Sequence, residues 1–331
     1  MALTPTPWID IHGHAGRCFL AGLDSSDVVV RGLGGPEVSS AYSSAKDAGL
    51  AAVTLSTVAD LRVLAPDSAK GLRAAREFRQ GEAYADHQRQ LQEIERLVHA
   101  AGAEIAVTAA DVGRSHVAGR TAVLVSCEGG DFLEGDLERL AKARAAGVSS
   151  LTLVHYRVND LGDVQTEEPL HGGLTPFGRD VVAECNRLRI IVDCAHASFA
   201  TTMDVLAQSS RPVMLSHSHL SHAERWHPRL LSVEHAQAVA SAGGLIGAWP
   251  SGVTSTSLGD FADEVVRLAE LVGPGHVGIG TDMDANYRPV LTSYAEFALL
   301  PELLDARGVS STDTDKILGA NFIDLLGEVG G

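Results

Sequence analysis

The chain has 331 residues and a formal charge of −16, because 42 acidic side chains outnumber 26 basic ones. This excess would repel a nucleic-acid backbone, so we expect no nucleic acid as a partner. No stretch has the roughly 18 apolar residues that a membrane span needs, and the first residues lack the pattern of a secretory signal. We therefore expect a cytoplasmic protein with no membrane partner.

Short apolar runs alternate with helix-like segments along almost the whole chain. Each run lies between polar or glycine-rich flanks, which indicates a short buried strand. The predicted strands are 8–14, 51–57, 121–128, 149–155, 190–196, 212–217, 244–249 and 276–282. Repeated βα units favour a parallel sheet, and eight of them predict a (β/α)8 TIM barrel of the α/β class. Such barrels commonly use about 250 residues or more, so we expect one domain spanning residues 1–331.

The segments between the strands give several helix signals. Apolar residues recur at helical intervals over 78–101 and 259–272, and Thr175 followed by Pro176 predicts the start of a helix over 176–188. Residues 103–110 are predicted to form an additional strand. Residues 15–45 are predicted to form a long loop, and its GLGGP segment at 32–36 lacks the preceding strand that a phosphate-binding loop requires.

Imidazole and carboxylate side chains end six of the predicted strands. They are His12, His14, Glu128, His155, His196, His217 and Asp282. A parallel barrel gathers its carboxyl strand ends at one rim, where the enzymes of this architecture carry their active sites. Histidine and carboxylate side chains that meet there would form a metal centre.

Four of these side chains are predicted to belong to the metal centre: His12, His14, Glu128 and Asp282. Side chains two apart in a strand share a face, so His12 and His14 point the same way, although such a pair alone can also be a polar strand end. Glu128 precedes Gly129, in a setting where an unpaired carboxylate would be costly unless it bound a cation. Asp282 ends the last strand and would close the ring, where it can hold a metal and also move the proton of an attacking water.

The other three histidines lie between Glu128 and Asp282 along the chain. His196 and His217 should occupy neighbouring strands, which favours metal ligation over the alternative of hydrogen-bonded core histidines. His155 is either a further ligand or a group that stabilises a developing oxyanion, and we predict the second role. The four cysteines show no metal-binding spacing and are interpreted as buried thiols, with the role of Cys127 beside Glu128 left open.

The residues from Glu128 onward resemble the renal, or membrane, dipeptidases (peptidase family M19) of the amidohydrolase superfamily. The resemblance rests on CEGG at 127–130, LTLVH at 151–155, GGLTPFGRDVVAECNRL at 172–188, DCAH at 193–196, LSHS at 215–218, GIGTDMD at 278–284 and ILGANF at 317–322. It implies a barrel with two zinc ions bridged by Glu128. One ion would be held by His12, His14, Glu128 and Asp282, and the other by Glu128, His196 and His217.

The resemblance also implies two substrate contacts. His155 would face the scissile bond, and Arg229 would bind the free carboxylate of the substrate, unless Arg229 forms a surface ion pair. Trp249 stands at the seventh strand end, where the family usually has a different sequence, and we expect it to contact the substrate. Additional histidines follow His217 in the sequence, namely His219, His222 and His227. They either contact the substrate and contribute to specificity, or lie in a solvated loop.

His14 departs from the family pattern, which usually has an aspartate at this position. An imidazole still suits zinc but removes one negative charge, so a single zinc ion is a second possibility. The sequence thus predicts a zinc-dependent dipeptidase acting on a small dipeptide-like substrate, with a possible homodimer. The alternatives are a hydrolase of another small amide, a β-lactam or a lactone, and a weakly catalytic metal-binding homologue.

Overall fold

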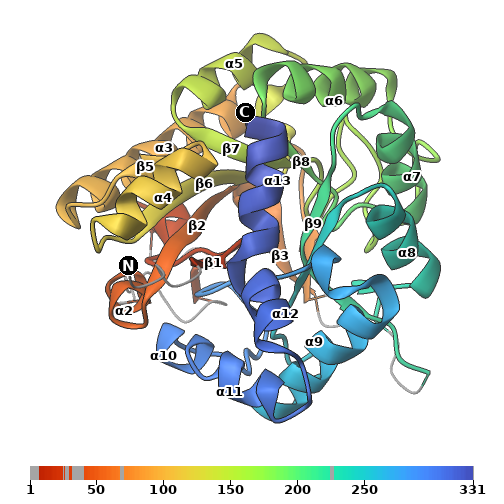
Figure 1. The fold of residues 1–331 in the computed structure, drawn as a ribbon. Helices are drawn as coiled ribbons and strands as arrows, with labels where there is room; N and C mark the ends of the chain where they lie inside the picture. Colours follow the sequence, from red (N-terminus) through yellow and green to blue (C-terminus); the bar gives the residue numbers. More distant parts are fainter. Residues whose placement is uncertain are drawn as a thin grey trace.

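The computed structural model describes residues 7–24, 26, 30–31, 41–67, 71–223 and 227–330. Eight parallel strands form a nearly closed barrel with helices packed around it (Figure 1). The α/β barrel class that the alternation of strands and helices predicts is therefore confirmed.

The strands follow one another around the barrel in chain order. They are β1 (Trp8–Asp10), β2 (Leu50–Val58), β6 (Ala122–Glu128), β7 (Val148–Thr152), β8 (Ile191–Asp193), β9 (Met214–Leu220), β11 (Leu245–Ala248) and β12 (Val277–Ile279). The backbone N–H of Ile11 donates to the carbonyl of Ile279 at 3.0 Å, and that of Asp282 donates to the carbonyl of His12 at 2.9 Å. These bonds join the residues after β1 to the end of β12 and to the residues that follow it, so the two ends of the sheet meet.

Helices pack around the outside of the barrel (Figure 1). The α-helices in the described residues are α2 (Ala41–Asp47), α3 (Glu82–Ala100), α4 (Ala109–Val117), α5 (Glu138–Ala145), α6 (Pro176–Leu188), α7 (Phe199–Gln208), α8 (Val233–Ser241), α9 (Leu258–Val272), α10 (Tyr294–Phe297), α11 (Leu300–Asp305), α12 (Ser311–Asp315) and α13 (Asn321–Gly330). The predicted helices correspond to α3, α6 and α9. Thr175 caps α6 as predicted, because its hydroxyl accepts the N–H of Gly178 at 2.9 Å.

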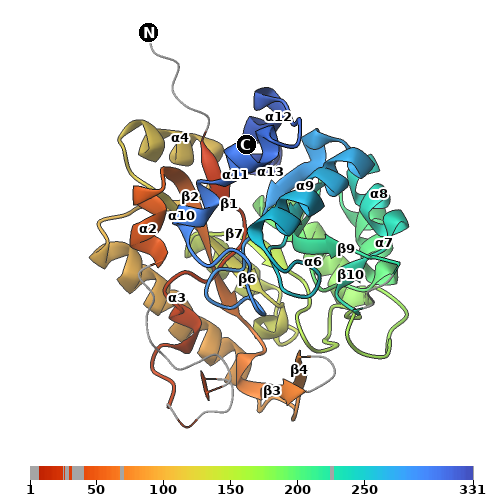
Figure 2. The same ribbon diagram turned by 90° about the horizontal axis from the view of Figure 1, so that it is seen from below.

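The C-terminal helix α13 covers the amino ends of the strands. Its apolar residues Phe322, Leu325 and Val329 are buried in one cluster with Ile9 of β1 and Met214 of β9. In Figure 1 this helix crosses the centre of the barrel. The antiparallel hairpin β3 (Leu64–Asp67) and β4 (Gly71–Ala74) follows β2 and lies at the opposite end of the molecule (Figure 2). The hairpin therefore lies at the carboxyl end of the barrel, the same end as the strand-end side chains.

Several predicted bounds were wrong. Strands β1, β7, β8 and β12 stop two to four residues before the histidines and the aspartate that were expected to end them, because the chain turns into the rim at these points. The segment 15–45 is not a loop throughout, since it contains the 3-10 helix η1 (Cys18–Leu20) and the start of α2. The predicted strand at 103–110 is only β5 (Ile105–Ala106), and the GLGGP segment lies outside the described residues.

None of the helices in the described part of the chain is long and apolar enough to cross a membrane.

Gly247 in β11 provides a test of how tightly the barrel is packed. A Cβ atom at this position would lie 1.8 Å from the carbonyl oxygen of Ser216 in β9. We expect Gly247→Ala to lower the free energy of unfolding by about 1–3 kcal/mol or more, because backbone atoms must move. Gly327→Ala in α13 is the control, since nothing lies within 4 Å of its added Cβ, and it should stabilise the protein by up to about 1 kcal/mol. Equal urea midpoints for the two variants would contradict the close contact between β9 and β11.

Candidate metal centre

The strand-end side chains that the sequence singles out meet at the carboxyl rim of the barrel. Glu128 is the last residue of β6, and His217 lies within β9. The others stand on the short segments that follow their strands, and all are buried: His12, His14, His155, His196 and Asp282. The structure thus brings together every residue that was predicted to hold a metal.

Glu128 lies at the centre of this group. Its Oε1 atom is 3.4 Å from Nε2 of His12 and 3.1 Å from Nε2 of His196. Its Oε2 atom is 3.3 Å from Nε2 of His14, which is itself 3.3 Å from Oδ1 of Asp282. The Nε2 atoms of His196 and His217 are 3.0 Å apart. The carboxylate therefore lies between two groups, the first around His12 and His14 and the second around His196 and His217.

These separations fit metal ligation. Zinc binds imidazole nitrogen and carboxylate oxygen at about 2.0–2.1 Å, and a tetrahedron of that size places its ligand atoms about 3.3 Å apart. The two groups, His12–His14–Glu128 and Glu128–His196–His217, each present three ligand atoms within 4.8 Å of one another. The Nε2 atoms of His12 and His14 are buried and form no hydrogen bond with any residue that the structure describes. The donor set therefore suits divalent cations on both sides of Glu128.

The other ring nitrogens orient two of the imidazoles. Nδ1 of His14 lies 3.2 Å from the carbonyl oxygen of Ser56, which can only accept, so Nδ1 carries the proton and Nε2 faces the carboxylates. Nδ1 of His217 lies 2.9 Å from the hydroxyl of Ser216. In both rings the atom that faces Glu128 is Nε2, which leaves that nitrogen free to act as a ligand.

The electrostatics of the rim also favour a cation. Burial by itself lowers the pKa of His14, but its contacts with Asp282 and Glu128 raise that pKa to about 10. Burial opposes ionisation of Glu128 too, yet the nearby His155 and His12 hold its pKa well below its usual value. Burial lowers the pKa of His196 and of His217 well below the ordinary range, so both rings are neutral. The two carboxylates thus draw positive charge to Nε2 of His14, and a bound cation would supply that charge in place of the proton.

His196 and Asp282 adopt backbone conformations that are rare for residues other than glycine. Their φ angles are +64° and +53°, in the left-handed region that costs of order 1–3 kcal/mol for such residues. Strain of this kind persists where the surroundings hold the backbone in place, as they do at functional sites. The turn after each strand thereby directs His196 towards Glu128 and Asp282 towards His14.

His155 is held by a residue that the sequence reasoning missed. Its Nδ1 atom lies 2.6 Å from Oδ1 of Asp60, which is 0% exposed, and its Nε2 atom lies 3.5 Å from Oε2 of Glu128. Asp60 follows β2 by two residues, and the register pairs Val58 of β2 with Glu128 of β6. The carboxyl end of the run TLSTVAD was the available signal, because Asp60 stands beyond a predicted strand like the other rim residues.

Arg229 is buried close to Trp249, whose ring contacts that of His217. It is 1% exposed, so the alternative of a surface ion pair was wrong. One guanidinium nitrogen donates to Oε1 of Gln165 at 2.8 Å, and Nε and Nη2 have no partner among the described residues. The guanidinium carbon lies 5.4 Å from the ring centroid of Trp249, and that ring is 5.8 Å from the ring of His217. The indole N–H of Trp249 is likewise buried and unpaired within the described chain.

Two further buried carboxylates organise the rim and were not predicted. Asp10 accepts the backbone N–H and the hydroxyl of Thr281 at 2.9 and 2.5 Å, and the hydroxyl of Tyr294 at 2.7 Å. Asp193 accepts the N–H groups of Ala195 and Ser216, both at 2.9 Å, and the hydroxyl of Thr152 at 2.6 Å. Asp10 joins the first and last strands, and Asp193 joins β7, β8 and β9.

The additional histidines do not all lie in a solvated loop. His219 is 2% exposed, and its Nδ1 atom is 2.9 Å from Oε1 of Glu264 in α9. Glu264 also receives two bonds from Arg267, at 2.8 and 2.9 Å, and the same guanidinium reaches Nε2 of His222 at 3.1 Å. His219, His222 and Glu264 present three possible ligand atoms within 4.8 Å of one another, and Arg267 already places its positive charge against Glu264 and His222. His227 is half-buried, and its Nδ1 atom accepts the N–H of Arg229 at 3.2 Å.

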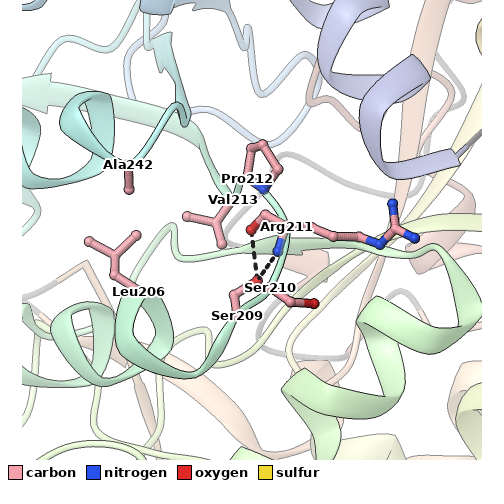
Figure 3. Close-up of a pocket in the computed structure, with 7 residues that line it drawn as sticks. All are labelled: Leu206, Ser209, Ser210, Arg211, Pro212, Val213 and Ala242. Carbon is pink, nitrogen blue, oxygen red and sulfur yellow. Dashed lines mark hydrogen bonds between the residues drawn. The ribbon is translucent and has the colours of Figure 1, made fainter.

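Two surface cavities lie apart from the Glu128 group, which we define as Glu128 with His12, His14, His155, His196, His217 and Asp282. One of about 220 Å³ adjoins the Glu264 cluster just described. The other, of about 260 Å³, is lined by residues that precede β9 or follow α8, namely Leu206, Ser209, Ser210, Arg211, Pro212, Val213 and Ala242 (Figure 3). Because Pro212 and Val213 come before the start of β9, this second cavity lies at the amino end of the barrel, away from the rim.

All four cysteines are buried and unpaired, as the sequence predicts. Burial raises the pKa of Cys127 to about 12, so its thiol stays protonated at neutral pH and is a poor nucleophile.

Comparison with known proteins identifies relatives of the chain. The family model described as "Membrane dipeptidase (Peptidase family M19)" matches residues 54–330. Dipeptidase aclJ of Aspergillus oryzae is 34% identical over 227 residues, which are 65% of this chain and 53% of that protein. Dipeptidase verJ of Clonostachys rogersoniana is 31% identical over 232 residues, which are 68% of this chain and 60% of that protein. The matches thus span little more than half the length of these relatives.

A solved structure shows the same fold. It is a metallopeptidase from Rhodobacter sphaeroides, liganded with a phosphinate mimic of the dipeptide L-Ala-D-Ala. Its TM-score is 0.78 at 21% identity, and the match covers 98% of this chain and 99% of that one.

We predict that Glu128 is required for metal binding. Glu128→Gln should lower the zinc content of the purified protein by at least one ion per chain, because both ligand groups lose their shared anionic oxygen. Elemental analysis by mass spectrometry measures this content. Glu264→Gln is the matched control, since Glu264 is a buried carboxylate beside two histidines whose charge Arg267 already balances. Equal zinc contents in wild type and Glu128→Gln would contradict the site.

Proposed function

The chain belongs to the membrane dipeptidase family (peptidase family M19), and from this premise we propose that it is a zinc-dependent dipeptidase that hydrolyses the amide bond of small dipeptides. The observation that carries the proposal is the buried Glu128 carboxylate, which has imidazole nitrogens from four different strand ends within 3.5 Å. A buried polar centre of this kind is costly to fold and is maintained where it holds a metal or performs chemistry.

Two zinc ions would share Glu128. His12, His14 and Asp282 would complete one site, and His196 and His217 the other. Neutral imidazole and carboxylate are ordinary zinc ligands. Because His14 stands where the family usually has an aspartate, the first site carries one negative charge fewer, and occupancy by one ion at the second site is the alternative.

The chain's own side chains would carry out the proton transfers and the positioning. When bound, a zinc pair supplies a water of lowered pKa and polarises the amide carbonyl. Asp282 would accept the proton of that water and return it to the leaving amine. Nε2 of His155 would donate to the carbonyl oxygen as negative charge develops on it, a contribution often worth about 3 kcal/mol. Burial opposes protonation of His155, but Asp60 and Glu128 raise its pKa, so the ring can serve as a donor.

Arg229 and Trp249 would bind the substrate's free carboxylate. Nε and Nη2 of Arg229 are buried without a partner in the described chain, which is unfavourable unless a ligand satisfies them. A carboxylate accepts both in the bidentate geometry that arginine favours. The indole N–H of Trp249 is a third donor beside them. Gln165 fixes the guanidinium through its remaining nitrogen.

The bulk of Trp249 beside His217 favours a second candidate function. Trp249 stands where the family usually has a different sequence, and a changed substrate contact at this position would suit another small amide, a β-lactam or a lactone. A weakly catalytic metal-binding homologue is the third alternative, although a mere metal binder has no use for the His155 donor. A homodimer and a cytoplasmic location stay predictions.

Activity on dipeptides tests the proposal directly. Zinc-loaded protein should hydrolyse members of a panel of L,L- and L,D-dipeptides, as measured by release of the free amino acids. Asp282→Asn should lower kcat by about 10²-fold or more, because the proton acceptor is lost. A protein that carries zinc yet cleaves no dipeptide would exclude the dipeptidase and leave the alternative substrates.

A separate kinetic experiment tests the role of Arg229. Arg229→Ala should raise KM for dipeptides by about 10–100-fold, since a charge-assisted hydrogen bond contributes about 1.5–3 kcal/mol. The variant and the wild type should be equally poor on dipeptide amides, which lack the free carboxylate. Arg267→Ala serves as the control and should leave KM unchanged, because Arg267 pairs with Glu264. An unchanged KM in Arg229→Ala would favour a substrate without a carboxylate.

A further inference from the structure

We propose that Asp60 is a positioning residue, which holds the imidazole of His155 with its Nε2 atom directed into the metal centre. The inference rests on the proposed function for its kinetic consequence, but the contact itself can be tested without any substrate. Three observations support it: the two bonds that Asp60 makes, the direction in which they turn the ring, and the separate role of the nearby Asp131.

Asp60 makes one bond to the ring of His155 and another to the backbone beside it. Oδ1 lies 2.6 Å from Nδ1 of His155, and Oδ2 accepts the backbone N–H of Tyr156 at 3.0 Å. A single carboxylate thus fixes both the rim segment that carries His155 and the ring itself. Since Asp60 is fully buried, water does not compete for either bond.

The bond to Nδ1 determines what the other nitrogen can do. A carboxylate only accepts, so Nδ1 carries a proton and Nε2 is the atom turned towards Glu128, 3.5 Å away. Edge contacts with the rings of Tyr156 and His196, at centroid distances of 4.5 and 4.6 Å, hold the ring plane. Without the carboxylate, rotation of the ring could exchange the two nitrogens, and Nε2 would no longer face the reacting carbonyl.

A purely structural role would resemble that of Asp131, which lies three residues after Glu128. Asp131 accepts from a guanidinium nitrogen of Arg157 at 2.6 Å and from the amide of Asn159 at 3.2 Å, and so it fixes the same rim segment a few residues further on. It is buried like Asp60, but among the described residues its hydrogen bonds and ion pair are with Arg157 and Asn159 and not with His155. If Asp60 only stabilised this segment, removing the charge of either aspartate would have the same consequences.

The kinetic test combines Asp60→Asn with His155→Gln in a double-mutant cycle on the zinc-loaded protein. Asn keeps the size of Asp60 and can still accept from Tyr156, but it replaces the anionic partner of Nδ1. We expect Asp60→Asn to lower kcat by about 10–100-fold, as loss of a residue that orients a functional histidine does, with KM and zinc content within about twofold. In the His155→Gln background the same substitution should lower kcat by less than about twofold, because the imidazole through which Asp60 acts is already absent.

Asp131→Asn is the matched control and should leave kcat within about threefold of the wild type. Similar losses of kcat in Asp131→Asn and Asp60→Asn would overturn the proposal, and so would an undiminished effect of Asp60→Asn in the His155→Gln background. Either result would assign Asp60 a merely structural role.

A spectroscopic test separates this inference from the dipeptidase proposal. In zinc-loaded protein labelled with ¹⁵N-histidine, the short contact between Asp60 and Nδ1 of His155 should give a downfield, exchange-protected N–H proton. The signal should persist in Asp131→Asn and disappear in both Asp60→Asn and His155→Gln. Its persistence in Asp60→Asn would overturn the contact. Its presence in a protein that cleaves no dipeptide would support the contact while the proposed function failed.

Discussion

The charge of one buried carboxylate, Glu128, sets the requirement that the rest of the rim meets. Its side chain is 3% exposed, and a charge so far from water is very costly unless partners compensate it. Five imidazole nitrogens lie 3.1–3.5 Å from its two oxygens. They come from segments that follow β1, β7 and β8 and from β9 itself. The nearly closed ring of strands brings these groups, which lie far apart in the sequence, to one carboxylate.

Other buried carboxylates keep that ring in place. Asp10 joins the first and last strands through Thr281 and Tyr294, and Asp193 joins β7, β8 and β9. Asp10 lies two residues before His12 and Asp193 lies three residues before His196, so a shift of either strand end would move one of these imidazoles as well. This support explains how His196 and Asp282 can retain left-handed backbone conformations. The geometry of the centre is therefore built into the scaffold.

The parts of the structure that depend on local pattern could be predicted from the sequence, and those that depend on contacts between loops could not. Apolar runs locate the eight strands, and the polar residues just beyond them give the Glu128 group, because strand direction alone places them on one rim. Asp60 was missed although it follows β2, since its partner His155 lies 95 positions away. The burial of Arg229 and the pairing of His219 with Glu264 were missed for the same reason. Such pairs arise from how rim segments fold over one another.

His14 changes the charge balance of the rim. In the family pattern an aspartate at this position would add a third carboxylate to Glu128 and Asp282, whereas an imidazole adds none. If two divalent cations were bound, they would face two carboxylates, with Arg229 adding further positive charge and Asp60 balancing the imidazole of His155. An excess of positive charge of that kind would weaken the binding of a cation beside His14 but would strengthen the attraction for an anionic substrate. Under the proposed function, an imidazole in place of the aspartate would therefore act in opposite directions on metal occupancy and on carboxylate binding.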